Sequence, residues 1–245
     1  MMAGWLIMVL LYLLVTAYVG RRRMERCQGA DMTEERRIAQ YRFSLLWNAG
    51  TLLGMFVLMG LASVCWEEIG LRPVQLRPGG GIMLGAVLFL CVVLTALFLY
   101  QMLAFQCSAR YRESMTALMT QKRNAGGLYE RTVDSLIPRS RREKRWFFFT
   151  SFAAGLCEEI VFRGFFLYLL GRFFPAVPGV VLAAAAGFMF GAAHFYQGAR
   201  GVLKTALLGT LFGLLYLGTN SVVLCVPLHI LFDFSSAFLY ESGDE

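Results

Sequence analysis

Two adjacent glutamates followed by an arginine lie within a strongly apolar stretch of this chain. Glu158 and Glu159 are near the middle of residues 146–170, and Arg163 follows Glu159 by four positions. An ionisable side chain at bilayer depth costs about 2.5 to 3.5 kcal/mol on insertion scales, so such residues face a protein interior and are paired or functional. We therefore interpret this group as a buried site and not as a lipid-facing surface.

The helical period predicts different tasks for the two glutamates. Glu159 and Arg163 have the spacing of an ion pair on one helix face, with the acid in the favourable N-terminal position. Glu158 points about 100 degrees away from that face. We expect Arg163 to neutralise Glu159, which leaves Glu158 available as a general base near neutral pH.

The only two histidines of the chain supply further candidate groups. His194 ends an apolar run that starts near residue 180, and His229 lies four residues before Asp233 on one helical face. In a helical bundle these side chains could converge with Glu158. Such a set suits water activation by an acid and a base. It also suits zinc, because two neutral imidazoles and one carboxylate can hold the ion and leave a position for water.

The elements that must position these residues are transmembrane helices. Of the 245 residues, 58% are hydrophobic, and apolar runs long enough to cross a bilayer recur along the chain. This composition predicts an all-α polytopic membrane bundle with about seven transmembrane helices. The expected spans are residues 3–19, 45–66, 82–105, 146–170, 180–196, 202–217 and 221–240.

The distribution of charge orients the expected bundle. The net charge is +7, and nineteen of the 23 Lys and Arg residues fall in loops that alternate with loops holding only three. The positive-inside rule then places the N-terminus outside and the C-terminus in the cytoplasm. Segregation by loop excludes a nucleic-acid-binding stripe and predicts contact of loops 20–44 and 106–145 with anionic lipid headgroups. We expect an integral multi-pass protein of a bacterial cell membrane, of undetermined oligomeric state.

The chain divides into two parts that form one integrated membrane domain. Residues 1–145 hold three spans and the basic cytoplasmic loops, whereas residues 146–245 carry all the candidate groups. Asp31 stands three residues before Glu34, a spacing typical of a capping box, and this predicts a helix that continues into the second span.

Three motifs make the C-terminal part resemble a known family. In chain order they are EExxxR at Glu158, FxxxH at Phe190 and HxxxD at His229. This ordered set resembles the CPBP family of intramembrane proteases, also called the CAAX protease and bacteriocin-processing, or Abi, family. The resemblance covers roughly residues 146–240. It implies hydrolysis of a peptide bond in a membrane-associated or lipidated protein or peptide.

The resemblance also implies a role for each polar group. Glu158 would activate water with the help of His194, while His229 and Asp233 would stabilise the oxyanion. The family position of Asp233 is often Asn, and an ionised Asp donates no hydrogen bond. Asp233 would therefore be protonated, orient His229 or bind a metal. The family is described both as metalloproteases and as glutamate-dependent enzymes, so zinc held by Glu158, His194 and His229 stays an alternative.

Other interpretations remain open. Glu67, Glu68 and Arg72 also spell EExxxR, but they lie at the end of a span before Pro73 and predict a solvated loop. Buried carboxylates and histidines also fit a proton-coupled transporter, and an inactive family member could serve as a membrane scaffold. We favour the protease because the two halves of the chain show no inverted repeat and the motif residues are intact.

Overall fold

The computed structural model describes residues 2–28, 32–76, 81–124 and 135–235, and these ranges contain helices, turns and loops but no strand. The helices in chain order are α1 (Met2–Gln28), α2 (Glu34–Ala62), α3 (Gly81–Cys107), α4 (Ala109–Asn124), α6 (Arg141–Glu159), η1 (Ile160–Phe166), α7 (Leu167–Phe173), α8 (Gly179–Ala193), η2 (Phe195–Gln197), α9 (Gly198–Thr219) and α10 (Cys225–Ser235). The all-α prediction is confirmed for the described residues. The predicted span over 45–66 extends beyond α2, and that over 221–240 begins before α10 and ends outside the described residues.

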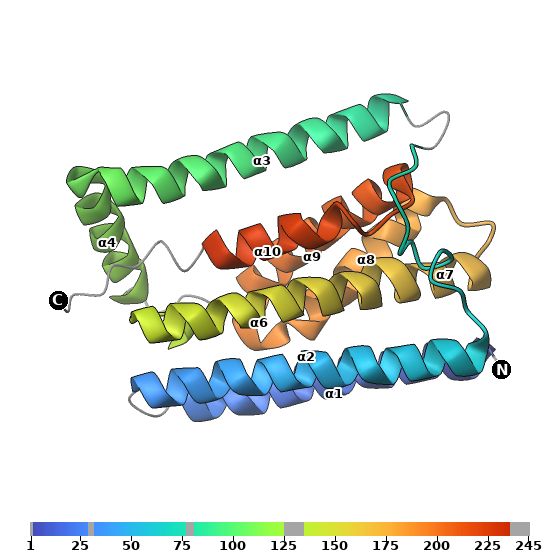
Figure 1. Ribbon diagram of the computed structural model, residues 1–245, viewed down its shortest axis with the longest axis horizontal. Coiled ribbons are helices and arrows are strands. Elements are labelled where there is room, and N and C mark those ends of the chain that lie inside the picture. The colour runs from blue at the N-terminus through green and yellow to red at the C-terminus, as the bar shows by residue number, and fades with distance from the viewer. Residues whose placement is uncertain (1, 29–31, 77–80, 125–134, 236–245) are drawn as a thin grey trace.

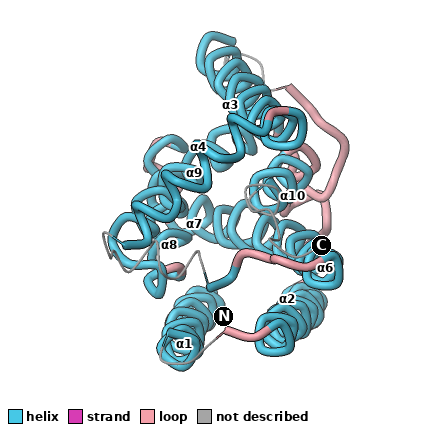
Figure 2. Tube along the Cα trace, turned by 90° about the vertical axis from the view of Figure 1, so that its left-hand side faces the viewer, coloured by secondary structure: helices cyan, strands magenta, loops and turns pink. Residues whose placement is uncertain are grey.

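The longer helices run side by side as a bundle (Figure 1). The pair α1 and α2 forms one face, α3 lies at the opposite face, and α6 to α10 fill the middle (Figures 1 and 2). Within this arrangement α1 packs against α8 and η2, whereas α2 packs against α6. The segment that carries the two glutamates is therefore enclosed by helices on several sides.

Length and composition support a membrane protein. Within the described residues, three helical segments are long and apolar enough to cross a bilayer: Glu34–Ala62, Gly81–Cys107 and Phe195–Thr219. The apolar helices α8 and α10 are shorter. The count of seven spans and the orientation of the termini stay predictions.

The helix that leads into the second span begins where the sequence predicted, but with a different cap. Thr33 is the N-cap of α2, and its side-chain oxygen accepts a hydrogen bond from the backbone N–H of Arg36 at 3.4 Å. Threonine satisfies one of the free N–H groups at a helix start in this way. The proposed capping residue Asp31 lies outside the described residues.

The predicted single helix over residues 146–170 is interrupted. It consists of α6, the π-helical segment η1 and the short helix α7. π-Helical turns within α-helices are rare and occur frequently at functional sites. Here the irregular segment begins directly after Glu159 and includes Arg163, so the backbone geometry changes at the position of the charged pair.

Small residues let α8 pack closely on α9. A Cβ atom on Gly191 would come within 2.6 Å of the carbonyl oxygen of Val202, and one on Gly213 within 3.0 Å of the Cβ of Ala183. Small residues let two helix backbones approach this closely in a membrane bundle. The position of His194, which follows α8 directly, is thereby determined by α9.

A second buried ion pair holds α2 against the start of α6. Glu143 is fully buried, and its Oε1 accepts a hydrogen bond from Arg37 Nε at 2.8 Å. The same carboxylate forms a capping box with Ser140 at the start of α6. The sequence analysis missed this pair, although the spacing of Ser140 and Glu143 is a capping-box signal. The Arg37–Glu143 pair sets the relative position of α2 and α6, and both helices contribute residues to the site.

Candidate active site

The expected ion pair between Glu159 and Arg163 is present. Arg163 Nη1 donates to Glu159 Oε1 at 2.8 Å, and the two side chains are 2% and 0% exposed, respectively. A buried charge requires such a partner because desolvation without one is costly. The pairing therefore explains how both groups are accommodated among apolar side chains.

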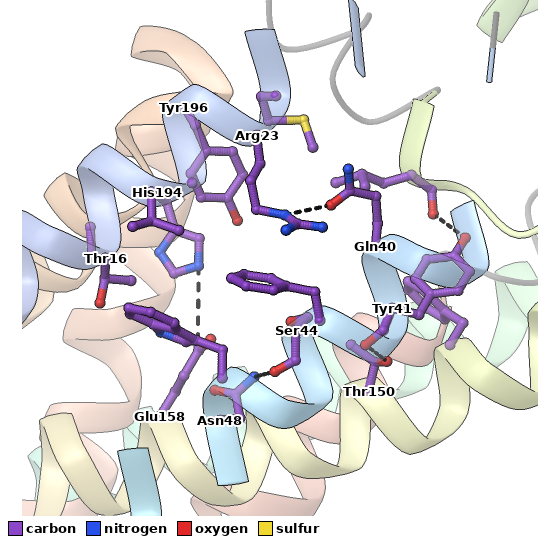
Figure 3. A pocket seen from close by; sticks show the side chains of 18 of the residues that line it. Thr16, Arg23, Gln40, Tyr41, Ser44, Asn48, Thr150, Glu158, His194 and Tyr196 are labelled. Carbon is purple, nitrogen blue, oxygen red and sulfur yellow. Dashed lines mark hydrogen bonds and ion pairs between the residues drawn. The ribbon is translucent and has the colours of Figure 1, made fainter. Parts of the chain in front are cut away.

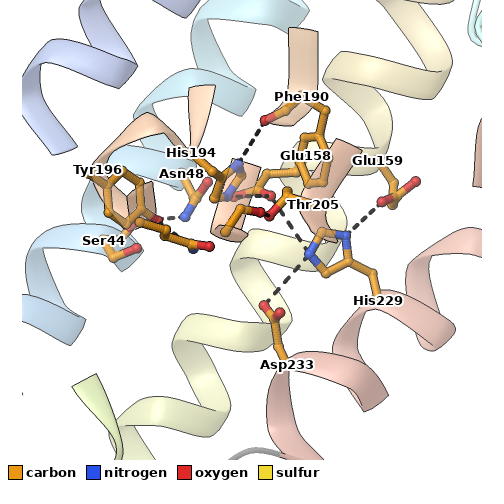
Figure 4. Close-up of polar contacts among 12 residues, drawn as sticks. Ser44, Asn48, Glu158, Glu159, Phe190, His194, Tyr196, Thr205, His229 and Asp233 are labelled. Carbon is orange, nitrogen blue, oxygen red and sulfur yellow. Dashed lines mark hydrogen bonds and ion pairs between the residues drawn. The ribbon is translucent and has the colours of Figure 1, made fainter. Parts of the chain in front are cut away.

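Glu159 also holds a histidine, which the sequence analysis did not foresee. His229 Nδ1 lies 2.6 Å from Glu159 Oε1 (Figure 4). A carboxylate only accepts hydrogen bonds, so Nδ1 is the donor and the ring presents Nε2 on its other side. Glu159 thus orients His229 in addition to pairing with Arg163. No sequence spacing indicates this contact, because the two residues are far apart in the chain.

Glu158 faces away from the ion pair and toward both histidines. Its Oε2 lies 3.9 Å from His194 Nε2 and 3.7 Å from His229 Nε2 (Figure 4). Neighbouring residues on a helix point about 100 degrees apart. Glu159 therefore meets Nδ1 of His229, whereas Glu158 meets Nε2 of the same ring. The structure therefore brings Glu158 together with His194 and His229, as the motif order predicted.

His194 is oriented by the end of its helix. The prediction placed it inside a span, but α8 ends at Ala193 and His194 is the C-cap. Its Nδ1 lies 2.8 Å from the carbonyl oxygen of Phe190, which can only accept a hydrogen bond, so Nδ1 carries the proton. A neutral ring in this position presents an unprotonated Nε2 to Glu158. The four-residue spacing of the FxxxH motif is what allows this contact.

Asp233 joins the group through His229. Its Oδ2 lies 3.6 Å from His229 Nε2, the nitrogen that also faces Glu158. The Asp233 side chain is 41% exposed, whereas that of His229 is only 6% exposed. The HxxxD spacing therefore places the carboxylate at the edge of the cluster and the imidazole inside it.

The Phe190 ring packs against the charged and imidazole groups. Arg163 Cζ lies 4.4 Å from the ring centroid, a distance suited to a cation–π contact. The same ring lies edge-on to His194, with centroids 4.8 Å apart. Phe190 thus restricts the orientation of His194 through both its ring and its carbonyl oxygen.

A cavity of about 210 Å³ opens beside Glu158 and His194 (Figure 3). His229 and Asp233 are not among the residues that line it. Most of the wall comes from α1 and α2, which carry none of the three family motifs. The lining residues are Tyr12, Thr16, Val19, Gly20, Arg23, Met24, Gln40, Tyr41, Phe43, Ser44, Trp47, Asn48, Leu136, Phe147, Thr150, Glu158, Phe162, Ala193, His194 and Tyr196.

The predicted zinc ligands come from three different helical segments and meet beside the cavity. Within the described part of the chain, no group of three or more His, Cys, Asp or Glu side chains is arranged to hold a metal ion. Glu158, His194 and His229 lie close together, with Glu158 Oε2 at 3.9 Å from His194 Nε2 and 3.7 Å from His229 Nε2. Zinc binding by these residues stays a prediction.

Comparison with known proteins identifies the region that contains this site. Residues 143–235 match the family model described as type II CAAX prenyl endopeptidase Rce1-like. No curated protein and no solved structure gives a significant match. The matched region includes every predicted site residue from Glu158 to Asp233 and supports a CPBP-type intramembrane peptidase. Residues 143–235 are thus an Rce1-like domain of the CPBP, or CAAX protease, family.

Proposed function

We propose that this protein hydrolyses a peptide bond in a membrane-associated or lipidated substrate, with Glu158 and His194 activating water. One observation carries the proposal. Glu158 Oε2 and His194 Nε2 are 3.9 Å apart on the wall of a cavity. His194 Nδ1 is bonded to the carbonyl oxygen of Phe190, which leaves Nε2 directed at Glu158. A base must lie within reach of the water that it deprotonates.

In this mechanism a water molecule enters the cavity and is bound by the two side chains. Glu158 accepts a proton from the water, and the oxygen attacks the carbonyl carbon of the substrate. The resulting tetrahedral intermediate carries negative charge on the former carbonyl oxygen. Collapse breaks the carbon–nitrogen bond, and Glu158 returns the proton to the leaving amine. The products are a carboxylate and a new N-terminus.

His229 and Asp233 are assigned to the negative charge of the intermediate. With both ring nitrogens protonated, His229 donates from Nδ1 to Glu159 and has Nε2–H available for the oxyanion. Asp233, at 3.6 Å from Nε2, orients the ring and donates nothing when ionised. Glu159 and Arg163 are positioning residues in this scheme, because they act through His229. Removal of a single oxyanion donor in comparable enzymes lowers kcat by about 10²- to 10³-fold.

The test uses purified protein in detergent with two synthetic substrates. One is an S-prenylated peptide of the CaaX type, and the other is an unlipidated transmembrane peptide. Wild-type protein is expected to cleave at least one of them, whereas Glu158→Ala and His194→Ala each lose cleavage. Full cleavage by either variant contradicts the proposed mechanism.

Two alternatives give different results in the same preparation. A zinc enzyme contains stoichiometric zinc after purification and loses cleavage on treatment with a chelator. A proton-coupled transporter shows pH-dependent solute flux in proteoliposomes that Glu158→Gln abolishes, with no proteolysis in the wild type. Zinc-independent cleavage without flux supports the glutamate mechanism over both.

A further inference from the structure

One face of α2 forms a wall of the cavity, although α2 lies outside the Rce1-like domain. The α2 residues on this wall recur at the spacing of a single helix face and are Gln40, Tyr41, Phe43, Ser44, Trp47 and Asn48. A substrate held beside Glu158 therefore contacts side chains that none of the family motifs includes.

Trp47 presents a hydrogen-bond donor that has no acceptor. Its Nε1 atom is buried, and no described residue accepts its hydrogen bond. An indole N–H can only donate, and buried polar groups without partners are uncommon in native proteins. The ring itself is held by stacking on Phe43, with centroids 6.0 Å apart and planes inclined by 26°. Trp47 thus carries an unsatisfied donor on a residue of the cavity wall, and a carbonyl oxygen is the kind of group that accepts its hydrogen bond.

Asn48 is the next residue and carries a second donor. Its side chain is buried, and Nδ2 donates to the carbonyl oxygen of Ser44 at 3.0 Å. Because that oxygen only accepts, the contact determines which end of the amide is the nitrogen, and the amide group retains a further N–H. Figure 3 shows Asn48 on the same side of the cavity as Glu158. This donor therefore lies nearer to the proposed base than Arg23 and Gln40 do.

We propose that Trp47 Nε1 and Asn48 Nδ2 bind backbone carbonyl oxygens of the substrate, next to the bond that Glu158 attacks. The inference rests on the proposed function and deepens it. Both donors are neutral, so they suit peptide carbonyls better than an anionic group. In an α-helix the carbonyl oxygens are already bonded to N–H groups four residues later. The ligand is therefore an extended or unwound peptide segment, not an intact transmembrane helix.

The first test compares two tryptophan substitutions. Trp47→Phe keeps an aromatic ring beside Phe43 but removes the N–H donor and part of the ring volume. Trp66→Phe makes the same change at a residue that is 50% exposed and does not line the cavity. Cleavage of the S-prenylated CaaX-type peptide is measured. Loss of one hydrogen bond is expected to lower kcat/KM about tenfold in Trp47→Phe. Trp66→Phe keeps wild-type values, and Asn48→Ala falls at least as far as Trp47→Phe.

The second test reads the donor directly and does not need turnover. Protein with ¹⁵N-labelled tryptophan and the Glu158→Gln substitution is titrated with the same peptide in detergent, and indole N–H resonances are recorded by NMR. The Trp47 resonance, assigned from its absence in Trp47→Phe, is expected to move downfield with added peptide, while the Trp66 resonance stays in place.

These results separate the inference from the proposed function. Glu158-dependent cleavage with full activity in both Trp47→Phe and Asn48→Ala overturns the inference and leaves the protease proposal standing. A peptide-dependent shift of the Trp47 resonance without any cleavage by the wild type supports peptide binding by Trp47 and Asn48. The same result contradicts the protease proposal. Absence of both cleavage and a Trp47 shift overturns both.

Discussion

The motif EExxxR occurs twice in this chain, beginning at Glu67 and at Glu158, and the two copies have opposite environments. The first lies in turns and bends after α2, where both glutamates are exposed. The second lies at the junction of α6 and η1, where Glu159 and Arg163 are buried and paired. The five-residue spacing alone does not determine an ion pair. It does so only where a helix places the second and last residues of the motif on one face.

The partners of the two copies differ in the same way. Glu68 Oε2 accepts a hydrogen bond from the backbone N–H of Cys65 at 2.8 Å, and Arg72 Nε donates to the backbone carbonyl of Asn220 at 3.0 Å. The first copy thus stabilises a loop through backbone contacts, and Glu68 Oε1 also accepts a hydrogen bond from the Tyr168 hydroxyl at 3.3 Å. The second copy bonds side chain to side chain and reaches His229, which makes it a candidate for chemistry.

The two copies also touch each other. A Cβ atom on Gly164 would lie 2.8 Å from the carbonyl oxygen of Ile69, so the loop of the first motif packs directly on the π-helical segment of the second. The loop also contacts the segment between α9 and α10, where the N–H of Val222 donates to Gly70 O at 3.0 Å. The first motif supports the geometry of the second without sharing its role.

The sharpest contrast is expected from the first glutamate of each motif. Glu158→Gln removes the proposed base and should lower kcat for peptide cleavage by about 10³-fold or more, since general-base catalysis contributes about 10²- to 10⁴-fold. Glu67→Gln should retain wild-type activity because Glu67 is exposed in a loop. Cleavage rates of purified variants in detergent check both. Equal losses of kcat in the two variants would show that the two copies of the motif do not differ in function.

Substitution of the second glutamate of each motif should change the stability of the protein by different amounts. Glu159→Ala leaves Arg163 buried without its partner, and breaking a buried ion pair costs about 3 to 5 kcal/mol of unfolding free energy. Glu68→Ala removes an exposed side chain that accepts a hydrogen bond from the N–H of Cys65, and should cost only about 0.5 to 1.5 kcal/mol. Denaturant unfolding of both variants in the same detergent measures the difference. An unchanged free energy of unfolding in Glu159→Ala would show that the ion pair does not stabilise the fold.

Two glycine substitutions test the contact between the motifs. Gly164→Ala forces a methyl group against Ile69 O and should destabilise the protein by about 1 to 3 kcal/mol, the range of overpacking effects. Gly171→Ala is the matched control on α7, where a Cβ atom meets nothing within 4 Å. It should be neutral or stabilising by up to about 1 kcal/mol, because alanine favours helix over glycine. Thermal unfolding in detergent compares the stabilities of the two variants. A Gly164→Ala variant that is more stable than Gly171→Ala would contradict the contact between the motifs.

The smallest effect is expected at the arginine of the first motif. Arg72→Gln weakens one hydrogen bond to a backbone carbonyl and should cost about 0.5 to 1.5 kcal/mol of stability, with no change in kcat. The corresponding change at the second motif, Arg163→Gln, should lower both stability and kcat because it disturbs the Glu159–His229 contact. Parallel unfolding and cleavage assays on the two variants check this. A kcat loss in Arg72→Gln would place the loop closer to the chemistry than the structure indicates.

The membrane character, the helical class and the residues of the site followed from local patterns in the sequence. Apolar runs need about twenty residues to cross a bilayer, and a charged residue inside such a run must face the interior, so composition and position were sufficient. The pairing of Glu159 with Arg163 followed from the helical period. These are properties of short segments, which is why a single sequence determined them.

Only the tertiary structure decided which groups meet and what surrounds them. Glu159 holds His229, His194 lies just beyond the end of α8, and the cavity beside Glu158 is walled mainly by α1 and α2. Each of these depends on how helices distant in the chain pack together. Packing is set by side-chain volume and by the need to satisfy buried polar groups across helices, and no local spacing encodes it. The sequence by itself thus determined the chemical groups and their membrane setting, while tertiary packing decided their partners and the walls of the cavity.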